Sequence, residues 1–411
     1  MVGQSGVGEA GRRGSDVRSD CWVSVELNGD GGTRLELASK VEALFGTSIR
    51  MGVHDTLAKL EVENVLVRVE DQGALPWVIQ ARLETALRRA GLEGQGDARP
   101  PARAPSRPDG TAKDRLRRSR LYLPGNEPKF AVNAGLHGPD GVILDLEDSV
   151  HHAEKDAARL VVRNALRCVD FGKAERMVRI NQGEEGLKDL DAVVPEGPEM
   201  ILIPKVETSE QVQEVQARID TIQRARGISQ AVWIMPILES ALGIENAVDI
   251  GLSSPSMAAL TIGLEDYTAD LGVVKTPEGS ESLWARSRLV NAARAAGVQA
   301  IDSVYGDVAD EEGLLAWGKR SRAMGFVGMG CIHPRQIRVI HQAFAPGAGE
   351  LEKALRIVAA FEEAQEKGLG VVSLGTKMID RPVVLRARKL VAQAKDAGLV
   401  PDDGQEGGKA S

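Results

Sequence analysis

The chain has 411 residues, 43% of them hydrophobic and 3% aromatic, which predicts about two to three domains with cores of Ala, Val, Leu and Ile. Its formal net charge of −8 excludes a general nucleic-acid binder, although local patches remain able to bind phosphates. Three scattered cysteines, Cys21, Cys168 and Cys331, exclude a disulfide framework and a zinc-ligand spacing and favour a reducing cytoplasm.

A small α/β module is predicted at the start of the chain, over residues 1–92. Residues 1–15 are rich in Gly, contain no apolar signal segment and are expected to be mobile. The apolar patterns that follow predict two strands and three helices: Trp22–Leu27 and Val65–Glu70 as strands, and Leu37–Leu44, Val53–Leu60 and Val78–Ala90 as helices. No run of about 18 apolar residues occurs in the chain, so we expect no membrane span.

A change of composition separates this module from the rest of the chain. Gly91–Ala112 is rich in Pro and Gly and lacks apolar periodicity. Such a composition is typical of a solvated tether. We therefore predict a flexible linker over residues 93–115.

Eight short apolar runs follow, and stretches of helical character separate most of them. The predicted strands are Leu121–Pro124, Gly141–Leu146, Met177–Asn181, Met200–Pro204, Val232–Ile237, Ala258–Gly263, Ala300–Val304 and Phe326–Ile332. Alternating strands and helices predict a parallel sheet, and eight such units favour a closed (β/α)8 TIM barrel over residues 116–345. The alternative is an open doubly wound sheet, but no GxGxxG motif follows a predicted strand.

Residues 346–411 are predicted to form a helical C-terminal segment. A helix rich in Glu, Ala and Lys is expected over 346–367, a Gly-punctuated stretch follows, and a last helix is expected at Val383–Ala397. The segment is too short to form a domain of its own. We expect it to cover the mouth of the barrel as a lid or to dock on a neighbouring subunit.

Acidic residues close two neighbouring predicted strands, which makes these strand ends the main candidate for a metal site. Glu239 follows Val232–Ile237, and Asp266 follows Ala258–Gly263. Carboxylates at the ends of adjacent parallel strands can converge on a divalent cation, and oxygen ligands suit Mg²⁺. Each acid alone is equally well explained as a helix cap or first-turn residue. Together they favour a cation, because neighbouring carboxylates repel each other without one.

Other charged residues fall at the ends of the same set of strands. Glu147 and Asp148 belong to the acidic run after the second strand, where a helix cap is the alternative for Asp148. Arg179 ends the third strand and is expected either to bind a substrate carboxylate or to pair with the acidic run. Lys205 ends the fourth strand and is a candidate Schiff-base lysine, but nearby acids would raise its pKa, so metal-assisted chemistry is preferred.

The barrel half of the chain carries a series of motifs in a fixed order. They are Arg118-Ser-Arg-Leu-Tyr-Leu-Pro-Gly, Leu144-Asp-Leu-Glu-Asp-Ser-Val, Val178-Arg-Ile-Asn, Leu202-Ile-Pro-Lys, Ile237-Leu-Glu-Ser-Ala-Leu-Gly-Ile, Gly263-Leu-Glu-Asp-Tyr, Ile332-His-Pro-Arg-Gln-Ile and Gly368-Leu-Gly-Val-Val-Ser-Leu-Gly-Thr-Lys-Met-Ile-Asp. In this order they resemble the citrate lyase beta subunit family, the HpcH/HpaI aldolase-like group that includes citryl-, malyl- and citramalyl-CoA lyases. The resemblance extends from Arg118 to Ala397.

The N-terminal module resembles a different protein, the gamma subunit of citrate lyase, which is an acyl carrier protein. The likeness is carried by Ser39-Lys-Val-Glu-Ala-Leu-Phe-Gly, His54-Asp-Thr-Leu and Val69-Glu-Asp-Gln-Gly-Ala-Leu-Pro-Trp. It implies a phosphoribosyl-dephospho-CoA prosthetic group on a serine near the N-terminus. Ser19 is the candidate and Ser15 the alternative, and a third possibility is an exposed, unmodified N-terminal serine.

The barrel resemblance implies an Mg²⁺-dependent lyase acting on a citryl-type 3-hydroxy-acyl thioester. The products would be an acetyl thioester and a 2-oxo acid such as oxaloacetate. Glu239 and Asp266 would hold Mg²⁺, Arg179 would clamp a carboxylate, and Asp380 from an adjacent subunit would be the acid/base, with a helix cap as its alternative role. The residues implied in substrate binding are Arg118, Arg179, Glu147, Asp148 and Lys205.

The resemblance also implies partners and leaves rival functions. A homo-oligomer, either a trimer or a hexamer, is expected, and an alpha-type citrate lyase subunit is a further candidate partner. One rival is a malyl-CoA or citramalyl-CoA lyase that uses free CoA esters, since pocket volume decides between substrates that differ by one small group. The other is a non-catalytic scaffold whose N-terminal module is an unmodified docking domain.

Overall fold

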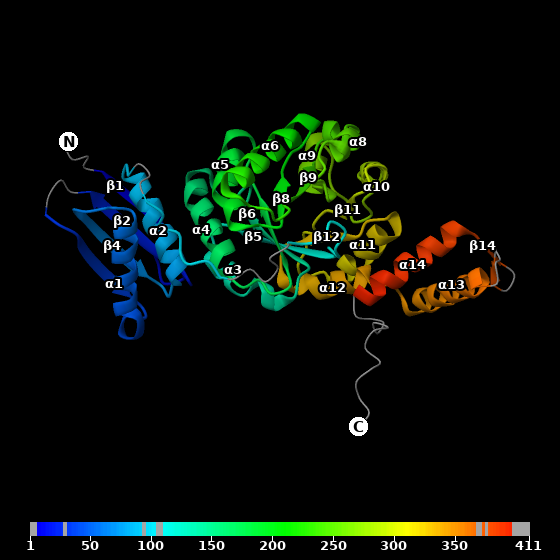
Figure 1. Cartoon of the computed structure of the whole chain (residues 1–411), viewed down its shortest axis with the longest axis horizontal. Coiled ribbons are helices and arrows are strands. Elements are labelled where there is room, and N and C mark those ends of the chain that lie inside the picture. The colour runs from blue at the N-terminus through cyan, green and yellow to red at the C-terminus, as the bar shows by residue number, and fades with distance from the viewer. Residues whose placement is uncertain are drawn as a thin grey trace, which may run out of the picture.

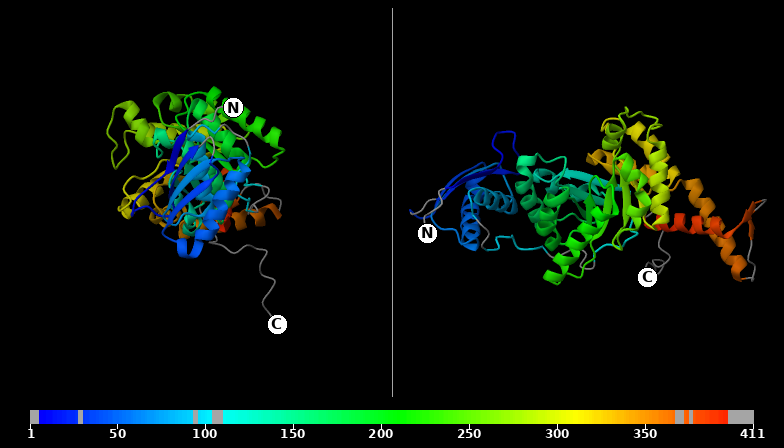
Figure 2. Two further views of the ribbon diagram at one scale, coloured as in Figure 1. Left: turned by 90° about the vertical axis from the view of Figure 1, so that its left-hand side faces the viewer. Right: turned by 90° about the horizontal axis from the view of Figure 1, so that it is seen from above.

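The computed structural model describes residues 6–27, 31–92, 96–103, 110–366, 372–374 and 377–396. Three parts follow one another along the molecule: a small N-terminal α/β domain, a barrel and a C-terminal helical hairpin (Figure 1). The N-terminal domain and the hairpin lie at opposite ends of the barrel, as the view from above in Figure 2 also shows. None of the described helices is long and apolar enough to cross a membrane.

A four-stranded sheet packed on two helices forms the N-terminal domain. Its strands are β1 (Val7–Gly11), β2 (Cys21–Leu27), β3 (Arg34–Ser39) and β4 (Val65–Asp71), in the order β1-β2-β4-β3, and only β3 and β4 are parallel. Buried and partly exposed residues alternate along β4, so one face of the sheet meets the helices. The helices are α1 (Glu42–Lys59) and α2 (Pro76–Arg89).

Two predictions for this domain are wrong, whereas the strands expected at Trp22–Leu27 and Val65–Glu70 and the helix expected at Val78–Ala90 are confirmed. The Gly-rich start contains β1, whose Gly8 lies so close to α2 that an added Cβ would meet the Ala86 carbonyl at 2.1 Å. Leu37–Leu44 is not a helix, because β3 extends to Ser39 and α1 begins only at Glu42.

Eight parallel strands close a barrel, as predicted. They are β5 (Ser119–Pro124), β6 (Gly141–Asp145), β7 (Glu175–Arg179), β8 (Met200–Ile203), β9 (Trp233–Leu238), β10 (Ala259–Ile262), β11 (Gln299–Asp302) and β12 (Gly328–Cys331). Neighbours in the barrel follow chain order, and β12 pairs with β5 to close it. Each predicted strand overlaps one of these eight, so the TIM-barrel fold is confirmed.

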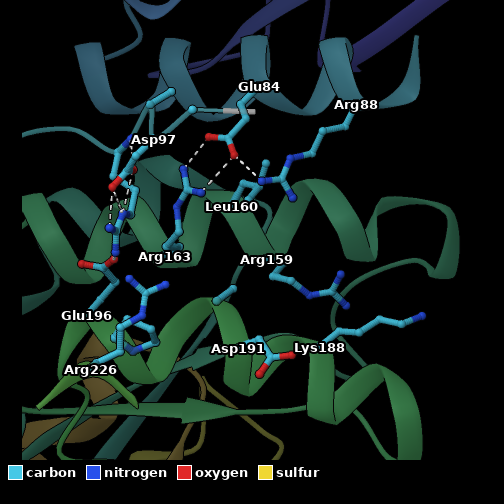
Figure 3. Close-up of a pocket in the computed structure, with 15 residues that line it drawn as sticks. Glu84, Arg88, Asp97, Arg159, Leu160, Arg163, Lys188, Asp191, Glu196 and Arg226 are labelled. Carbon is cyan, nitrogen blue, oxygen red and sulfur yellow. Dashed lines mark hydrogen bonds and ion pairs between the residues drawn. The ribbon is translucent and has the colours of Figure 1, made fainter. Parts of the chain in front are cut away.

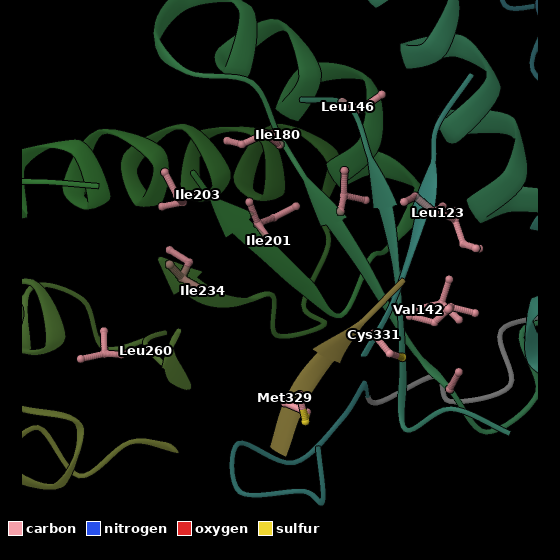
Figure 4. Packing of buried hydrophobic residues seen from close by; sticks show 14 of the residues in the cluster. Leu123, Val142, Leu146, Ile180, Ile201, Ile203, Ile234, Leu260, Met329 and Cys331 are labelled. Atoms are coloured by element: carbon pink, nitrogen blue, oxygen red, sulfur yellow. The ribbon is translucent and has the colours of Figure 1, made fainter. Parts of the chain in front are cut away.

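The α-helices of the barrel connect these strands in chain order. They are α3 (Pro128–Val132), α4 (Lys155–Cys168), α5 (Gly183–Val193), α6 (Ser209–Arg226), α7 (Ala241–Glu245), α8 (Ala247–Leu252), α9 (Leu264–Leu271), α10 (Leu283–Ala295), α11 (Glu311–Met324) and α12 (Pro334–Phe344). Apolar side chains such as Ile201 and Ile203 fill the layer between strands and helices (Figure 4). A second apolar cluster, which includes Met177, Met200 and Met235, fills the barrel interior.

Helix α2 of the N-terminal domain packs on α4 of the barrel, and buried ion pairs fix this contact. Glu84 accepts hydrogen bonds from both terminal nitrogens of Arg163, at 3.0 and 2.6 Å, as Figure 3 shows. Arg82 pairs with Asp20 at 2.8 Å and also donates to the Asn126 carbonyl of the barrel at 3.0 Å. The N-terminal domain is therefore held against its own barrel.

The described part of the predicted linker also lies on the barrel. Arg103 donates its backbone N–H to the Arg167 carbonyl at 2.9 Å, and Arg99 pairs with Glu196 at 3.1 Å. Residues 93–95 and 104–109 lie outside the described residues. The contacts of residues 96–103 differ from the solvated tether that composition predicts, because arginines in this Pro-rich run find acceptors on the barrel. The boundaries of the linker stay a prediction.

The C-terminal segment forms a helical hairpin. Its helices are α13 (Ala348–Glu366) and α14 (Arg381–Asp396), and the antiparallel strands β13 (Val372–Leu374) and β14 (Lys377–Ile379) lie between them in the chain. An apolar cluster that includes Ala354, Ile357, Val384 and Ala387 joins the two helices.

This hairpin lies away from the mouth of its own barrel. Lys389 and Leu390 of α14 share a cavity with Arg118 and Val327, which precede β5 and β12. These residues mark the amino ends of the strands, opposite the end at which barrel enzymes hold their active sites. The segment predicted as a lid therefore does not cover its own barrel mouth, and its docking on a neighbouring subunit stays a prediction.

Candidate active site

A cavity of about 460 Å³ opens at the carboxyl ends of the barrel strands. Its charged lining residues are Arg120, Asp145, Asp148, Arg179, Glu239, Glu265, Asp266 and Asp302. A larger cavity of about 570 Å³ lies between the N-terminal domain and the barrel (Figure 3), but several of its arginines are already paired with neighbouring carboxylates. Because barrel enzymes work at the carboxyl ends of their strands, the smaller cavity is the candidate active site.

Glu239 is the most constrained acid in this cavity. It follows β9, its side chain is buried with 6% exposure for the residue, and its Oε1 accepts a hydrogen bond from the Lys205 backbone N–H at 2.7 Å. An added Cβ on Gly263 would lie 2.3 Å from Glu239 Oε2, so the glycine at the end of β10 makes room for this carboxylate. Burial and then the charge of Asp266 raise the pKa of Glu239 to about 8.

Asp266 lies in the first turn of α9, directly after β10. It is close enough to Glu239 to raise its pKa, and its Oδ2 lies 4.0 Å from Lys205 Nζ. The structure thus brings the two predicted acids into one cavity, although Asp266 also occupies the helix-start position that its alternative role requires.

The donor set of this cavity suits Mg²⁺. Five carboxylates cluster around two cations, Arg179 and Lys205, and these carboxylates belong to Asp145, Glu147, Asp148, Glu239 and Asp266. Among the described residues no group of three metal-type side chains is found, so the protein offers a pair of carboxylates and no complete cage. Mg²⁺ is commonly held in this way, by one or two carboxylates with water and substrate oxygens as further ligands.

Arg179 is held by carboxylates on its own side of the cavity. Its Nε and Nη2 donate to the two oxygens of Asp145, both at 2.7 Å, and its Nη1 lies 3.0 Å from Glu147. Burial opposes the charged form of Asp145, but these bonds outweigh it and lower the pKa of that carboxyl. The alternative role expected for Arg179 was an ion pair with the acidic run. Such pairs are present, with Glu147 at 3.0 Å and with Asp148 at 3.6 Å.

Lys205 is a charged, oriented group in this structure. Its backbone has a positive φ of 52°, and its Nζ lies 2.7 Å from Glu147 and 3.2 Å from Asp148. Burial alone would lower the pKa of Lys205, but the hydrogen bond to Glu147 and the nearby charges raise it. A Schiff-base lysine needs a lowered pKa, so the geometry opposes that role.

Three other predicted site residues lie elsewhere. Arg118 precedes β5 and pairs with Asp140 at 2.9 Å at the amino end of the barrel, so its predicted contact with substrate does not agree with the structure. Asp380 is exposed at the start of α14 and accepts the Val383 N–H at 3.1 Å, as a helix cap does. Ser19 lies between β1 and β2 with a positive φ of 54°.

The loop that carries Ser19 and Ser15 lies beside the barrel mouth. Arg12 of this loop forms an ion pair with Glu127, and Asp20 is joined through Arg82 to the Asn126 carbonyl. Both barrel residues directly follow β5, whose last residue lines the cavity. The candidate attachment serines are therefore on the side of the N-terminal domain that faces the active-site end.

Two residues that belong to this cavity, Asp145 and Arg120, were not among the predicted site residues. Asp145 lies opposite Arg179 in the β6–β7 register and orients it. Arg120 lines the cavity, whereas the family resemblance implied Arg118 as the substrate-binding arginine of this region. The alternation of Arg120, Tyr122 and Pro124 along β5 is the signal that would have found it, since every second residue faces the barrel interior.

A barrel with charged residues gathered at the carboxyl ends of its strands has the architecture of a barrel enzyme. The model of the HpcH/HpaI aldolase/citrate lyase family matches residues 118–334, and the chain belongs to that family. The citrate lyase subunit beta of Leuconostoc mesenteroides subsp. cremoris is 40% identical over 294 residues, which cover 71% of this chain and 97% of that protein. The human mitochondrial citramalyl-CoA lyase is 33% identical over 68% of this chain and 85% of that protein. The chain is an enzyme of the lyase class.

Two further comparisons agree with this assignment. The family model of the malonate decarboxylase delta subunit, an acyl carrier protein, matches residues 10–90, so the N-terminal domain is similar to an acyl carrier protein. The solved CitE protein of Mycobacterium tuberculosis in complex with magnesium, acetoacetate and coenzyme A is 29% identical and superposes with a TM-score of 0.57. The match covers 69% of this chain and all of that one.

Glu239→Gln is expected to raise the thermal stability of the protein in EDTA at about pH 8 and to abolish stabilisation by Mg²⁺. Because the folded pKa of Glu239 is raised to about 8, its contribution to stability is present at low pH and is lost as pH rises through that value. The amide keeps the hydrogen bond from Lys205 but carries no charge to bury. Thermal unfolding with EDTA and with millimolar MgCl₂ at about pH 6 and 8 measures both effects.

Glu312→Gln, on the exposed side of α11, is the control. A variant that still responds to Mg²⁺ as the wild type does would contradict the assignment of the site.

Proposed function

We propose that this chain is an Mg²⁺-dependent carbon–carbon lyase that cleaves a citryl-type 3-hydroxy-acyl thioester to an acetyl thioester and a 2-oxo acid such as oxaloacetate. The observation that carries the proposal is the pairing of Glu239 with Asp266 in the cavity that Arg179 also lines. We further propose that the fused carrier domain presents the thioester to a barrel.

The proposed chemistry assigns each side chain a task. Mg²⁺ held by Glu239 and Asp266 would supply Lewis-acid stabilisation of the charge that develops on the substrate hydroxyl oxygen. Arg179, fixed by Asp145, orients a substrate carboxylate through Nη1. Lys205 keeps a positive charge at the rim and, held by Glu147 and Asp148, positions the acyl group. A base removes the hydroxyl proton, the carbon–carbon bond breaks, the 2-oxo acid leaves, and the acetyl thioester enolate takes up a proton.

Asp380 is proposed as the acid/base of a neighbouring subunit's site. In its own chain it belongs to a hairpin that meets the barrel at the amino ends of the strands. Since the cavity opens at the other end, an oligomer, either a trimer or a hexamer, is proposed to bring the hairpin of one chain to the mouth of the next. The exposed position of Asp380 is compatible with such a contact.

The carrier domain is proposed to deliver the thioester on a prosthetic group attached to Ser19, with Ser15 as the alternative. The ion pair of Glu84 with Arg163 and the hydrogen bond from Arg82 to the Asn126 carbonyl hold the domain in place, so the prosthetic arm itself, and not the polypeptide linker, would have to span the distance to the mouth. A tethered thioester acts at a raised effective concentration when the tether can reach the site. An alpha-type subunit that loads the acyl group is part of the same proposal.

Two rival functions are kept because specific observations favour them. A malyl- or citramalyl-CoA lyase acting on free CoA esters is favoured by the likeness to the citramalyl-CoA lyase and by the coenzyme A in the solved relative. An unmodified docking domain in place of a carrier is favoured by the buried ion pair of Glu84 with Arg163, which joins the N-terminal domain to its own barrel. Turnover of citryl-, malyl- and citramalyl-CoA by the full chain, with Mg²⁺ or EDTA, separates these functions. No cleavage of any of the three thioesters would contradict the proposed substrate class.

Mixing two inactive variants tests whether Asp380 acts across an interface. Asp380→Asn and Glu239→Gln are each expected to lose lyase activity. After co-refolding or co-expression in equal amounts, roughly a quarter of the sites would combine a wild-type barrel with a wild-type hairpin from its neighbour in a closed ring. Recovery of about that fraction of the wild-type rate is expected. A mixture as inactive as its components would show that the two residues act within one chain, and an Asp380→Asn variant that keeps its activity would leave Asp380 a helix cap.

The mass of the intact protein from its native host tests the carrier role. We expect an adduct of a phosphoribosyl-dephospho-CoA group, lost in Ser19→Ala and kept in Ser15→Ala. The two serines lie on the same loop, so each variant is the control for the other. An unmodified chain purified from the host would overturn the carrier proposal and favour the docking role, without touching the barrel chemistry.

A further inference from the structure

Arg120 is a buried cation at the floor of the active-site cavity. It lies on β5, its exposure is 1%, and it lines the same cavity as Glu239 and Asp266. Its position two residues before Tyr122 places its backbone about 7 Å deeper in the barrel than that tyrosine. No role has been assigned to it in the chemistry above.

The contacts of Arg120 leave its charge without a partner among the described residues. Its nearest polar atoms are Met235 Sδ at 3.2 Å from Nη1, and the Asp302 carbonyl at 3.3 Å and Thr261 Oγ1 at 3.4 Å from Nη2. Its Nε is buried and makes no hydrogen bond. The carboxylate of Asp302 is turned away from it and binds Arg286 and Ser321 at 2.5 and 2.6 Å. Two weak neutral contacts and a sulfur atom therefore replace the anion that a buried guanidinium normally has.

Other buried arginines of this chain show what Arg120 lacks. Arg82 pairs with Asp20 at 2.8 Å, Arg117 with Glu175 at 2.7 Å, and Arg286 with Asp302 at 2.5 Å. A charge taken out of water without compensation is costly, and burial lowers the pKa of Arg120 to about 10, which still leaves it charged near pH 7. The difference is that Arg120 reaches an open cavity, from which a ligand can supply the anion.

We propose that Arg120 determines substrate specificity by binding a second carboxylate of the substrate, on the arm of the cleaved carbon that becomes part of the 2-oxo acid. This deepens the function proposed above and rests on it. A substrate with only one carboxylate leaves the buried guanidinium unpaired, and a substrate with a carboxymethyl arm satisfies it.

The depth of the cavity fits such an arm. Thr261, which contacts Arg120, lies two residues before Gly263, where the Glu239 carboxylate approaches the backbone. One such strand step is about 7 Å. That depth leaves room for a short carboxylate arm between the carboxylates at the rim and the guanidinium of Arg120. The proposal therefore favours a 2-oxo acid product with a carboxylate two bonds from its carbonyl carbon over one that ends in hydrogen or methyl.

Stable ligand pairs test the subsite without relying on turnover. Malate and lactate are 2-hydroxy acids that differ by the second carboxylate, and their affinities for the full-length protein are measured by calorimetry with Mg²⁺ present. We expect the wild type to prefer malate by at least about tenfold, and Arg120→Met to lose that preference. Arg120→Lys keeps a positive charge and is expected to retain part of the preference for malate. Arg224→Met, on the exposed end of α6, is the matched control and should behave as the wild type.

Steady-state kinetics measure the same discrimination for the second carboxylate as a ratio of kcat/KM values. The ratio of kcat/KM for citryl-CoA to that for citramalyl-CoA is expected to fall on the order of 100-fold in Arg120→Met. An equal fall for both substrates, or an unchanged ratio, would overturn the proposal and leave Arg120 a structural residue. If Arg120→Met does not fold, the affinities of the wild type alone still test the proposal, because a wild type that binds malate and lactate equally well also overturns the proposal.

The affinity and the kinetic measurements together distinguish a failure of this proposal from a failure of the proposed lyase function. A malate preference that depends on Arg120, found in a protein that cleaves no thioester, sinks the lyase proposal and keeps the anion subsite. Lyase activity without any preference for the second carboxylate sinks only the subsite.

Discussion

The excess of carboxylates at the barrel mouth is the constraint on which the rest of the site depends. Asp145 is bound by Arg179, and Glu147 and Asp148 share Lys205. Arg179 and Lys205, the two cations of this cluster, are therefore both already paired with carboxylates. Asp266 reaches Lys205 only at 4.0 Å, Glu239 forms none of these ion pairs, and burial together with the charge of Asp266 makes the negative charge of Glu239 unfavourable. The site therefore divides into carboxylates that hold side chains in place and a carboxylate pair that needs a cation, which explains why so acidic a cavity can still bind an anionic substrate.

The placement of the two accessory parts follows from the direction of the barrel strands. Loops at the carboxyl ends of the strands meet the β1–β2 loop of the carrier domain, whereas the hairpin joins the barrel at the amino ends. In a single chain, the carrier loop is thus beside the mouth and Asp380 is not. This asymmetry gives the proposed functions different geometric requirements: the prosthetic arm can act within one chain, and the acid/base of the hairpin requires a second copy.

Most of the fold could be predicted from the sequence, because buried parallel strands are continuous apolar runs and each of the eight was visible as one. The meeting of Glu239 and Asp266 could be predicted too, since adjacent parallel strands end at the same rim. Arg120 was missed because the predicted strand began at Leu121, one residue after it, whereas β5 starts at Ser119 and therefore includes Arg120 in the inward-facing alternation with Tyr122. The bond between Asp145 and Arg179 required the β6–β7 register. The docking of the carrier domain depends on single ion pairs between segments far apart in sequence, such as Glu84 and Arg163, for which composition gives no signal.

Arg120 and the carboxylates of Glu239 and Asp266 give the cavity opposite charges at its two ends. Negative charge gathers at the rim and a positive charge lies at the floor, with the apolar Ile237 and Tyr122 lining the wall between them. Mg²⁺ held by Glu239 and Asp266 would make the rim attractive to substrate oxygens, and the guanidinium of Arg120 offers a partner to a carboxylate at the bottom of the cavity. A substrate held at both ends has its breaking bond fixed relative to the base, whereas one held only at the rim can rotate. Specificity and orientation would then come from the same buried guanidinium, because binding energy at a remote carboxylate is available to position the reacting carbon.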